Sequence, residues 1–277
     1  MREPRTASNG SSHMSELILN DGRAMPQLGL GTYQIPDAQV AAVVRAGLDL
    51  GFRLVDTAAM YHNERGVGDG VAHDDVWLTT KLWHDAHGDA GAALDASLAL
   101  LGRDQVDLYL IHWPHPSGER YVDAWRTLVS LREQGLARSI GVSNFLPEHL
   151  DAIIDATGVT PAVNQIELHP TFQQRAVQAA NRERGIVTQS WSPLGQGATL
   201  KDERIVAIAE AAGVTAAQVI IAWHLAKGFS VIPKAGDLEH LASNWAARDV
   251  RLTEEQIAAI DAMDDPDGRM GPDPREM

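Results

Sequence analysis

Residues 106–112 read VDLYLIH, a mostly apolar run that ends abruptly in a histidine. A run that is apolar on both faces is typical of a strand buried in a parallel sheet. Seven further runs share this character, at residues 28–32, 52–56, 76–80, 138–143, 162–167, 186–191 and 230–234. Between them apolar residues recur at helical spacing, as at Val40, Val44 and Leu48. Eight strand–helix units in one chain predict a (β/α)8 TIM barrel, with a doubly wound open sheet as the structural alternative.

The two ends of the chain differ from this pattern. Residues 1–14 are polar and low in complexity, which indicates either a leader added for expression or a disordered extension. Asp21 and Gly22, between two short apolar stretches, predict an N-terminal β-hairpin. The segment 264–277 is rich in proline, glycine and charge, and we expect a C-terminal loop over the barrel mouth. No linker-like tract interrupts the chain, so residues 15–277 are expected to form a single domain.

Composition excludes several classes of function. The chain of 277 residues has no cysteine, which excludes disulfides, thiolate metal sites and cysteine nucleophiles. Its net charge of −14 argues against nucleic acid or an anionic membrane as the main partner. No apolar run approaches the ~18 residues of a membrane span, and no signal-peptide core is present. We therefore expect a cytoplasmic protein that acts on a small molecule.

Polar or aromatic side chains stand at the carboxyl ends of seven consecutive runs, where barrel enzymes build their active sites. These residues are Asp56, Lys81, His112, Ser143, Asn144, Gln165, Trp191 and Lys234. Taken singly, Asp56 could be a helix cap and Lys81 a lysine reaching solvent. Their convergence on one mouth favours a shared functional site.

Four of the polar residues near this mouth fit proton donation to a carbonyl. The hydroxyl of Tyr61 is a weak acid, with an ordinary pKa near ~10. An ammonium at Lys81 would stabilise the phenolate and lower that pKa, and Asp56 would keep the ammonium charged. A neutral His112 could orient the carbonyl oxygen by a hydrogen bond. No side chain supplies hydride, so this chemistry requires a nicotinamide cofactor.

The chain from about residue 17 onward resembles the aldo-keto reductases, most closely the bacterial 2,5-diketo-D-gluconate reductase type. The resemblance rests on GFRLVDTAAMYHNE (51–64), TTKLW (79–83), DLYLIHWP (107–114), RSIGVSNF (138–145), PAVNQIELHP (161–170) and WSPLGQG (191–197). It implies NAD(P)H-dependent reduction of an aldehyde or ketone, such as a keto-sugar acid or a small dicarbonyl. It places Asp56, Tyr61, Lys81 and His112 at the catalytic positions, with Tyr61 as the general acid.

The resemblance also implies binding residues. The cofactor would contact Thr32, Tyr33, Asp56, Ser143, Asn144, Gln165, Trp191, Ser192, Leu194, Gln196, Lys234, Ala235, His240, Ser243 and Asn244. The substrate would contact Tyr33, Trp83, His112 and Trp113, with the tail near Met270 as a further wall. NADP(H) would be preferred.

One departure from the family pattern concerns the 2′-phosphate of NADP. The positions that commonly carry serine and arginine are here Ala235 and His240, with Asp237 between them. A histidine is charged only at mildly acidic pH. We therefore expect that NAD(H) is accepted and that NADPH affinity weakens from about pH 6 to pH 8.

Two other classes of function stay open. One is a non-catalytic nicotinamide-binding sensor on the same scaffold, as in the β subunits of potassium channels. The other is a metal-dependent isomerase or hydrolase, because His84/His87 and His112/His115 have ligand-like spacing, although no metal is expected. A monomer is the family-based expectation, and the sequence does not identify the physiological substrate.

Overall fold

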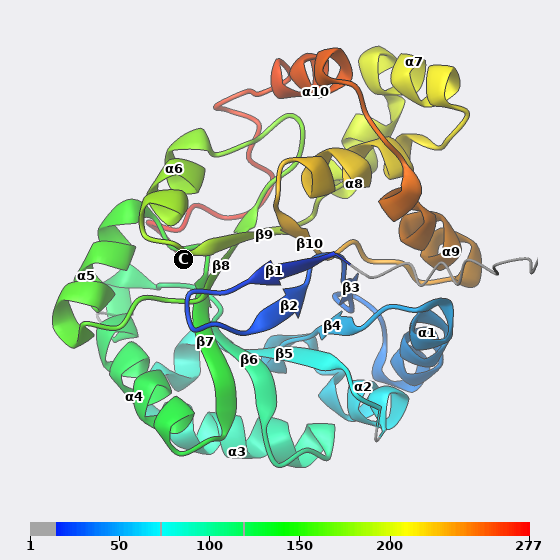
Figure 1. The fold of residues 1–277 in the computed structure, drawn as a ribbon. Coiled ribbons are helices and arrows are strands. Elements are labelled where there is room, and N and C mark those ends of the chain that lie inside the picture. The colour runs from blue at the N-terminus through cyan, green and yellow to red at the C-terminus, as the bar shows by residue number, and fades with distance from the viewer. Residues whose placement is uncertain (1–14, 73, 119) are drawn as a thin grey trace, which may run out of the picture.

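The eight predicted strands form one parallel sheet that closes into a barrel (Figure 1). In the computed structural model, residues 15–72, 74–118 and 120–277 are described, and the predicted leader lies outside them. The strands are β3 (Leu30–Gly31), β4 (Leu54–Asp56), β5 (Trp77–Leu82), β6 (Val106–Ile111), β7 (Ala137–Ser143), β8 (Val163–Glu167), β9 (Val187–Trp191) and β10 (Ser230–Val231). Each pairs in parallel with the next in chain order. The predicted (β/α)8 barrel is confirmed, and the open sheet is not.

The barrel closes between its first and last strands. Parallel bridges join Leu28 to Val231 and Gly31 to Lys234. A Cβ added at Gly31 would lie 2.7 Å from the carbonyl oxygen of Ile232, so only glycine allows these two segments to approach this closely.

Strand β6 shows why the apolar runs are apolar on both faces. Leu108 and Leu110 belong to a buried cluster with Leu54 and Val163 of other strands, which fills the barrel. Tyr109 and Ile111 belong to a larger cluster that includes residues of the surrounding helices. The alternation of side chains along a strand therefore places one set inside the barrel and the other beneath the helices.

Helices surround the barrel (Figure 1). They are α1 (Asp37–Leu50), α2 (Glu64–Val71), α3 (Ala90–Leu101), α4 (Tyr121–Glu133), α5 (Pro147–Thr157), α6 (Arg175–Glu183), α7 (Glu203–Ala212), α8 (Ala216–Ala226), α9 (Leu238–Ala246) and α10 (Glu254–Asp261). No single helix in the described ranges is long and apolar enough to cross a membrane. The consecutive helices α7 and α8 have the length and apolar composition of a membrane span only when they are taken together, and the chain bends by 91° between them.

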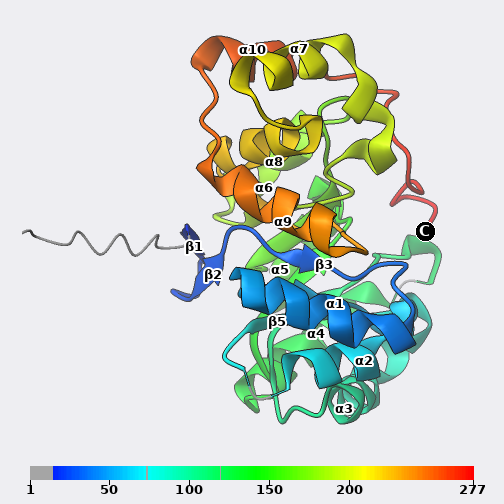
Figure 2. The same cartoon turned by 90° about the vertical axis from the view of Figure 1, so that its right-hand side faces the viewer.

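The two ends of the described chain lie at opposite ends of the barrel (Figure 2). The predicted hairpin, β1 (Glu16–Ile18) and β2 (Ala24–Pro26), is confirmed. Its Leu19 and Met25 pack with the residues that fill the barrel, so the hairpin covers that opening. At the other opening the segment after α10 runs over the carboxyl ends of the strands, as predicted for the C-terminal loop.

Candidate active site

A cavity of about 710 Å³ opens at the carboxyl ends of the strands. Ligand pockets commonly span about 300–1,000 Å³. Of the predicted site residues, those that line the cavity are Tyr33, Asp56, Tyr61, Trp83, His112, Trp113, Asn144, Gln165, Trp191, Ser192, Leu194, Gln196, Lys234 and Met270. Lining residues that the sequence analysis missed are Gly31, Gln34, Met60, Pro193, Gly197, Ile232, Pro233, Gly271, Pro272 and Met277. The strand ends therefore converge on one cavity.

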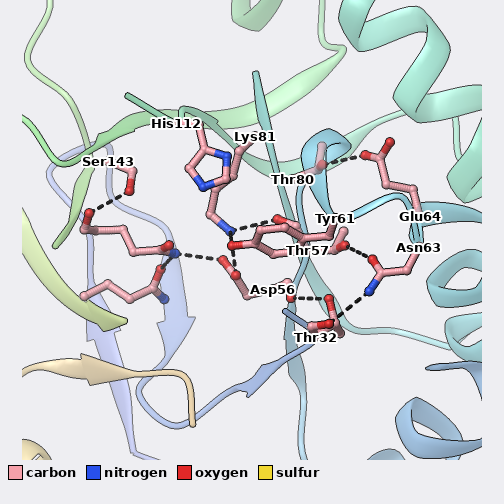
Figure 3. Close-up of polar contacts among 12 residues, drawn as sticks. Thr32, Asp56, Thr57, Tyr61, Asn63, Glu64, Thr80, Lys81, His112 and Ser143 are labelled. Atoms are coloured by element: carbon pink, nitrogen blue, oxygen red, sulfur yellow. Dashed lines mark hydrogen bonds and ion pairs between the residues drawn. The ribbon is translucent and has the colours of Figure 1, made fainter. Parts of the chain in front are cut away.

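The floor of the cavity holds a buried ion pair in contact with a tyrosine (Figure 3). Lys81, on β5, is fully buried, and its Nζ lies 2.6 Å from Oδ1 of Asp56 at the end of β4. The same Nζ donates to the carbonyl oxygen of Thr57 at 2.8 Å and to the hydroxyl of Tyr61 at 3.3 Å. Each of the three ammonium protons therefore has an acceptor, and one of these acceptors is the Tyr61 hydroxyl.

Burial acts on both members of this pair. It raises the pKa of Asp56, against the opposing influence of Lys81 and of hydrogen bonds from Lys81 and Gln165. It lowers the pKa of Lys81, against the attraction of Asp56. Each partner thus keeps the other charged in surroundings that disfavour an isolated charge.

The pKa of Tyr61 differs from the sequence-based expectation. Burial raises it well above its ordinary value, and the negative charge of Asp56 acts in the same direction. We expected Lys81 to lower this pKa, but the positive charge of Lys81 is balanced by the carboxylate of Asp56 in their ion pair. Tyr61 therefore keeps its proton near neutral pH, and its hydroxyl lies beside the Lys81 ammonium.

His112 stands beside Tyr61 and is held neutral. Burial lowers its pKa well below the ordinary value, and the charges at Lys81 and His84 add to this effect. Its ring packs edge-on against Tyr61 and Trp83, with centroids 5.6 and 5.2 Å apart. This agrees with the expectation of a neutral imidazole.

A buried network behind the site fixes the 3₁₀ turn Ala59–Tyr61 that carries the tyrosine. Asn63 accepts from Oγ1 of Thr57 and donates to the carbonyl oxygens of Thr32 and Ile35. Glu64, 3% exposed, accepts from Oγ1 of Thr80, the residue before Lys81. The Asn63–Glu64 pair stood in the resemblance motif, but the sequence analysis gave neither residue a role.

Gln165 has a side-chain oxygen that could accept a hydrogen bond from the carboxamide of a nicotinamide. Its Nε2 donates to Oδ2 of Asp56 and to Oε1 of Gln189, both at 2.7 Å. A carboxylate can only accept, so the amide orientation of Gln165 is determined. Its Oε1 accepts no hydrogen bond from the described residues and is left for an N–H donor in the cavity.

The side chain of Asn144, expected to contact the cofactor, makes its hydrogen bonds to the protein. Its Oδ1 accepts from Nε1 of Trp191 at 2.8 Å, and its Nδ2 donates to the carbonyl oxygen of His112 and to Oγ of Ser143. The side chain therefore orients the Trp191 ring, and its polar atoms already have protein partners. Ser143 in turn donates to the carbonyl oxygen of Gln165.

Four non-glycine residues that line the cavity adopt left-handed backbone conformations. They are Gln34, Asn144, Ser192 and Gln196, with φ between 48° and 63°. Such conformations are uncommon for residues with a side chain, and they concentrate at functional sites.

Six of the predicted cofactor residues do not line the cavity: Ser143, described above, and the five that follow. Thr32 donates to the carbonyl oxygen of Asp56, and Ala235 and Asn244 are buried. Ser243 lies 3.3 Å from the hydroxyl of Thr215, the N-cap of α8. His240, exposed at the start of α9, places its Nδ1 2.6 Å from Oδ2 of Asp237. Asp237 therefore holds the imidazole that was expected to face the 2′-phosphate.

The histidines with ligand-like spacing include two that stack against each other. His84 and His115 stack with their ring centroids 4.6 Å apart. Within the described residues, no group of three or more histidine, aspartate or glutamate side chains could hold a metal ion.

Comparison with known proteins agrees with this geometry. Residues 26–265 match the model of the aldo/keto reductase family. An aldo-keto reductase of Mycolicibacterium smegmatis is 48% identical over 94% of this chain and 96% of its own length. The methylglyoxal reductase DkgA of Yersinia pestis is also 48% identical, over 94% and 97%. A crystal structure of a Gox0644 mutant in complex with NADPH superposes with a TM-score of 0.93 at 48% identity, covering 95% of this chain and 98% of that one.

Proposed function

The chain belongs to the aldo/keto reductase family, and from this premise we propose that it reduces an aldehyde or ketone to an alcohol with NAD(P)H. The observation that carries the proposal is the hydrogen bond from the buried Lys81 ammonium to the Tyr61 hydroxyl in a cavity large enough for a ligand.

Tyr61 is the general acid in this proposal. As negative charge develops on the carbonyl oxygen, the tyrosine hydroxyl transfers its proton to that oxygen. The resulting phenolate lies beside the ammonium of Lys81, which Asp56 keeps charged from its other side. An isolated buried phenolate would be costly, so this arrangement lowers the barrier to proton transfer.

His112 orients the substrate. Because its pKa is depressed, it is neutral at working pH and can donate a hydrogen bond without supplying a charge. Tyr33, Trp83 and Trp113 stand around it as aromatic walls. A carbonyl carbon with small or apolar substituents fits such a lining.

A bound nicotinamide would supply the hydride that reduces the carbonyl carbon. Gln165 would accept from the carboxamide through its free Oε1, and Trp191, held by Asn144, would pack against the ring. Ser192, Leu194 and Gln196 would flank the pyrophosphate.

The cofactor preference is for NADP(H), with NAD(H) accepted. Homologous structures contain NADPH or NADP. In this chain Lys234 lines the cavity, and the described residues include no carboxylate within ion-pair distance of it. His240 is engaged by Asp237, so the charge available to a 2′-phosphate is smaller than with arginine.

The substrate class we propose is a small dicarbonyl or a keto-sugar acid. It is supported by the relative named methylglyoxal reductase and by the aromatic residues that line the cavity.

The test is initial-rate reduction of aldehydes, α-dicarbonyls and keto-sugar acids with NADPH and with NADH, before and after dialysis against a chelator. Turnover that requires the nicotinamide and survives chelation supports the proposal. NADPH binding without turnover of any carbonyl would favour the sensor, and loss of activity on chelation would favour a metal-dependent enzyme.

A further inference from the structure

Glu167, at the end of β8, has no part in the proton transfer, yet its carboxylate is buried, with 1% of the residue exposed. Oε1 accepts from the backbone N–H of Met270 at 2.7 Å and lies 3.1 Å from Nε2 of His169. Oε2 accepts from the backbone N–H of Gly271 at 2.9 Å. A side chain of the barrel thus binds two consecutive amides of the C-terminal tail, about a hundred residues away in the chain.

These amides belong to the part of the tail that walls the cavity. Met270, Gly271 and Pro272 all line it. A Cβ added at Gly271 would lie 2.6 Å from Cη2 of Trp191, so the tail backbone rests directly on this ring. The hydrogen bonds of Glu167 therefore fix the distance between the tail and the aromatic wall.

The charge state of Glu167 suits this role. Burial alone would raise its pKa, but hydrogen bonds from His169 and from the N–H groups of Gly271 and Met270 outweigh burial and lower the pKa. The group remains an ionised acceptor, and charge-assisted hydrogen bonds are stronger than neutral ones.

We infer that Glu167, oriented by His169, is a positioning residue that fixes the C-terminal tail as the outer wall of the substrate pocket and so sets which carbonyl compounds are accepted. The inference rests on the proposed carbonyl reduction. Substrates whose substituent reaches the wall gain apolar contact from it, and substrates confined to the catalytic floor do not.

The test compares Glu167→Gln with Asp264→Asn. Both replace a tail-anchoring carboxylate by its amide. Asp264 accepts from the backbone N–H of Gln173 and from Nε of Arg175, outside the cavity lining, so it is the matched control. Gly271→Ala is a second variant, because the added Cβ would meet the Trp191 ring and lie 3.1 Å from Oε2 of Glu167, which should displace the tail without a change of charge. Methylglyoxal and phenylglyoxal are the probe pair, because they share the reacting group and differ only in the substituent.

We expect Glu167→Gln and Gly271→Ala to raise KM for phenylglyoxal by about tenfold, as for exposure of part of one apolar side chain, and KM for methylglyoxal by less than about twofold. Asp264→Asn should leave the ratio of the two KM values as in the wild type. Trypsin provides a readout independent of activity, because Arg269 precedes the anchored amides. Cleavage after Arg269 should accelerate in Glu167→Gln more than in Asp264→Asn.

Equal changes for both substrates, or the same KM ratio change in Asp264→Asn, would overturn the inference. Unaltered cleavage after Arg269 in Glu167→Gln would overturn it as well. If the wild type reduces neither dicarbonyl, the proposed function fails instead, and the trypsin comparison still decides whether Glu167 fixes the tail.

Discussion

Replacement of Lys81 by methionine should destabilise the protein in a pH-dependent way. Lys81 and Asp56 form a fully buried pair at 2.6 Å. Removing one partner of such a pair costs about 3–5 kcal/mol, because the other charge is left without compensation. For a barrel of this size that corresponds to a fall in Tm of roughly 10 °C near neutral pH.

The sign of the pH dependence follows from Asp56. Burial already raises its pKa in the folded protein, and the variant loses the attraction of Lys81 that opposes this rise. A folded-state pKa above the unfolded value means that stability falls as pH rises from the unfolded pKa toward the folded one. The loss in Tm should therefore be smaller at pH 5 than at pH 8.

Thermal unfolding followed by circular dichroism at both pH values measures this effect, with Asp56→Asn/Lys81→Met as the control. The asparagine keeps an acceptor for Gln165 and removes the buried charge, so the double variant should be more stable than Lys81→Met alone. A fall in Tm of less than about 2 °C, equal at both pH values, would show that Lys81 and Asp56 do not form a buried, charged pair.

Two further predictions concern pH and cofactor choice. Because the pKa of Tyr61 is raised and that of His112 is lowered, both groups stay in their active forms for reduction, so kcat for reduction should be flat from about pH 6 to 9. Alcohol oxidation, which needs the Tyr61 phenolate, should rise over the same range, and a reduction rate that falls tenfold by pH 8 would contradict this assignment. His240→Arg should tighten NADPH binding by about tenfold or more and leave NADH unchanged, because the arginine adds a charge that only the 2′-phosphate of NADPH can meet. Fluorescence titration of both cofactors with the wild type and the variant decides it, and equal NADPH affinity in the two proteins would show that Lys234 and backbone amides suffice.

The strands and the floor of the cavity could be predicted because their sequence signals are local. An apolar run such as 106–111 is buried on both faces wherever a parallel barrel is formed, and a polar residue at its carboxyl end must face the mouth. The convergence of Asp56, Lys81 and His112 followed from this rule together with the family resemblance.

Other features depend on contacts between distant segments. The hydrogen bonds of Glu167 to Met270 and Gly271 join segments that are more than a hundred residues apart, and no local sequence pattern predicts them. The pairing of His240 with Asp237 is local, since Asp237 caps α9, but the sequence analysis placed the two against the phosphate. The direction of the Tyr61 pKa shift depends on the burial of Tyr61 and on the ion pair between Lys81 and Asp56. Both are known only from the structure.

Tyr61→Phe tests the central claim most directly. The phenylalanine keeps the ring and its packing against Tyr33 and His112 but removes the hydroxyl that Lys81 contacts. We expect kcat for carbonyl reduction to fall by about 10²–10⁴-fold, with NADPH affinity within about twofold of the wild type. A variant that binds NADPH normally and retains more than about a tenth of wild-type kcat would show that Tyr61 is not the proton donor.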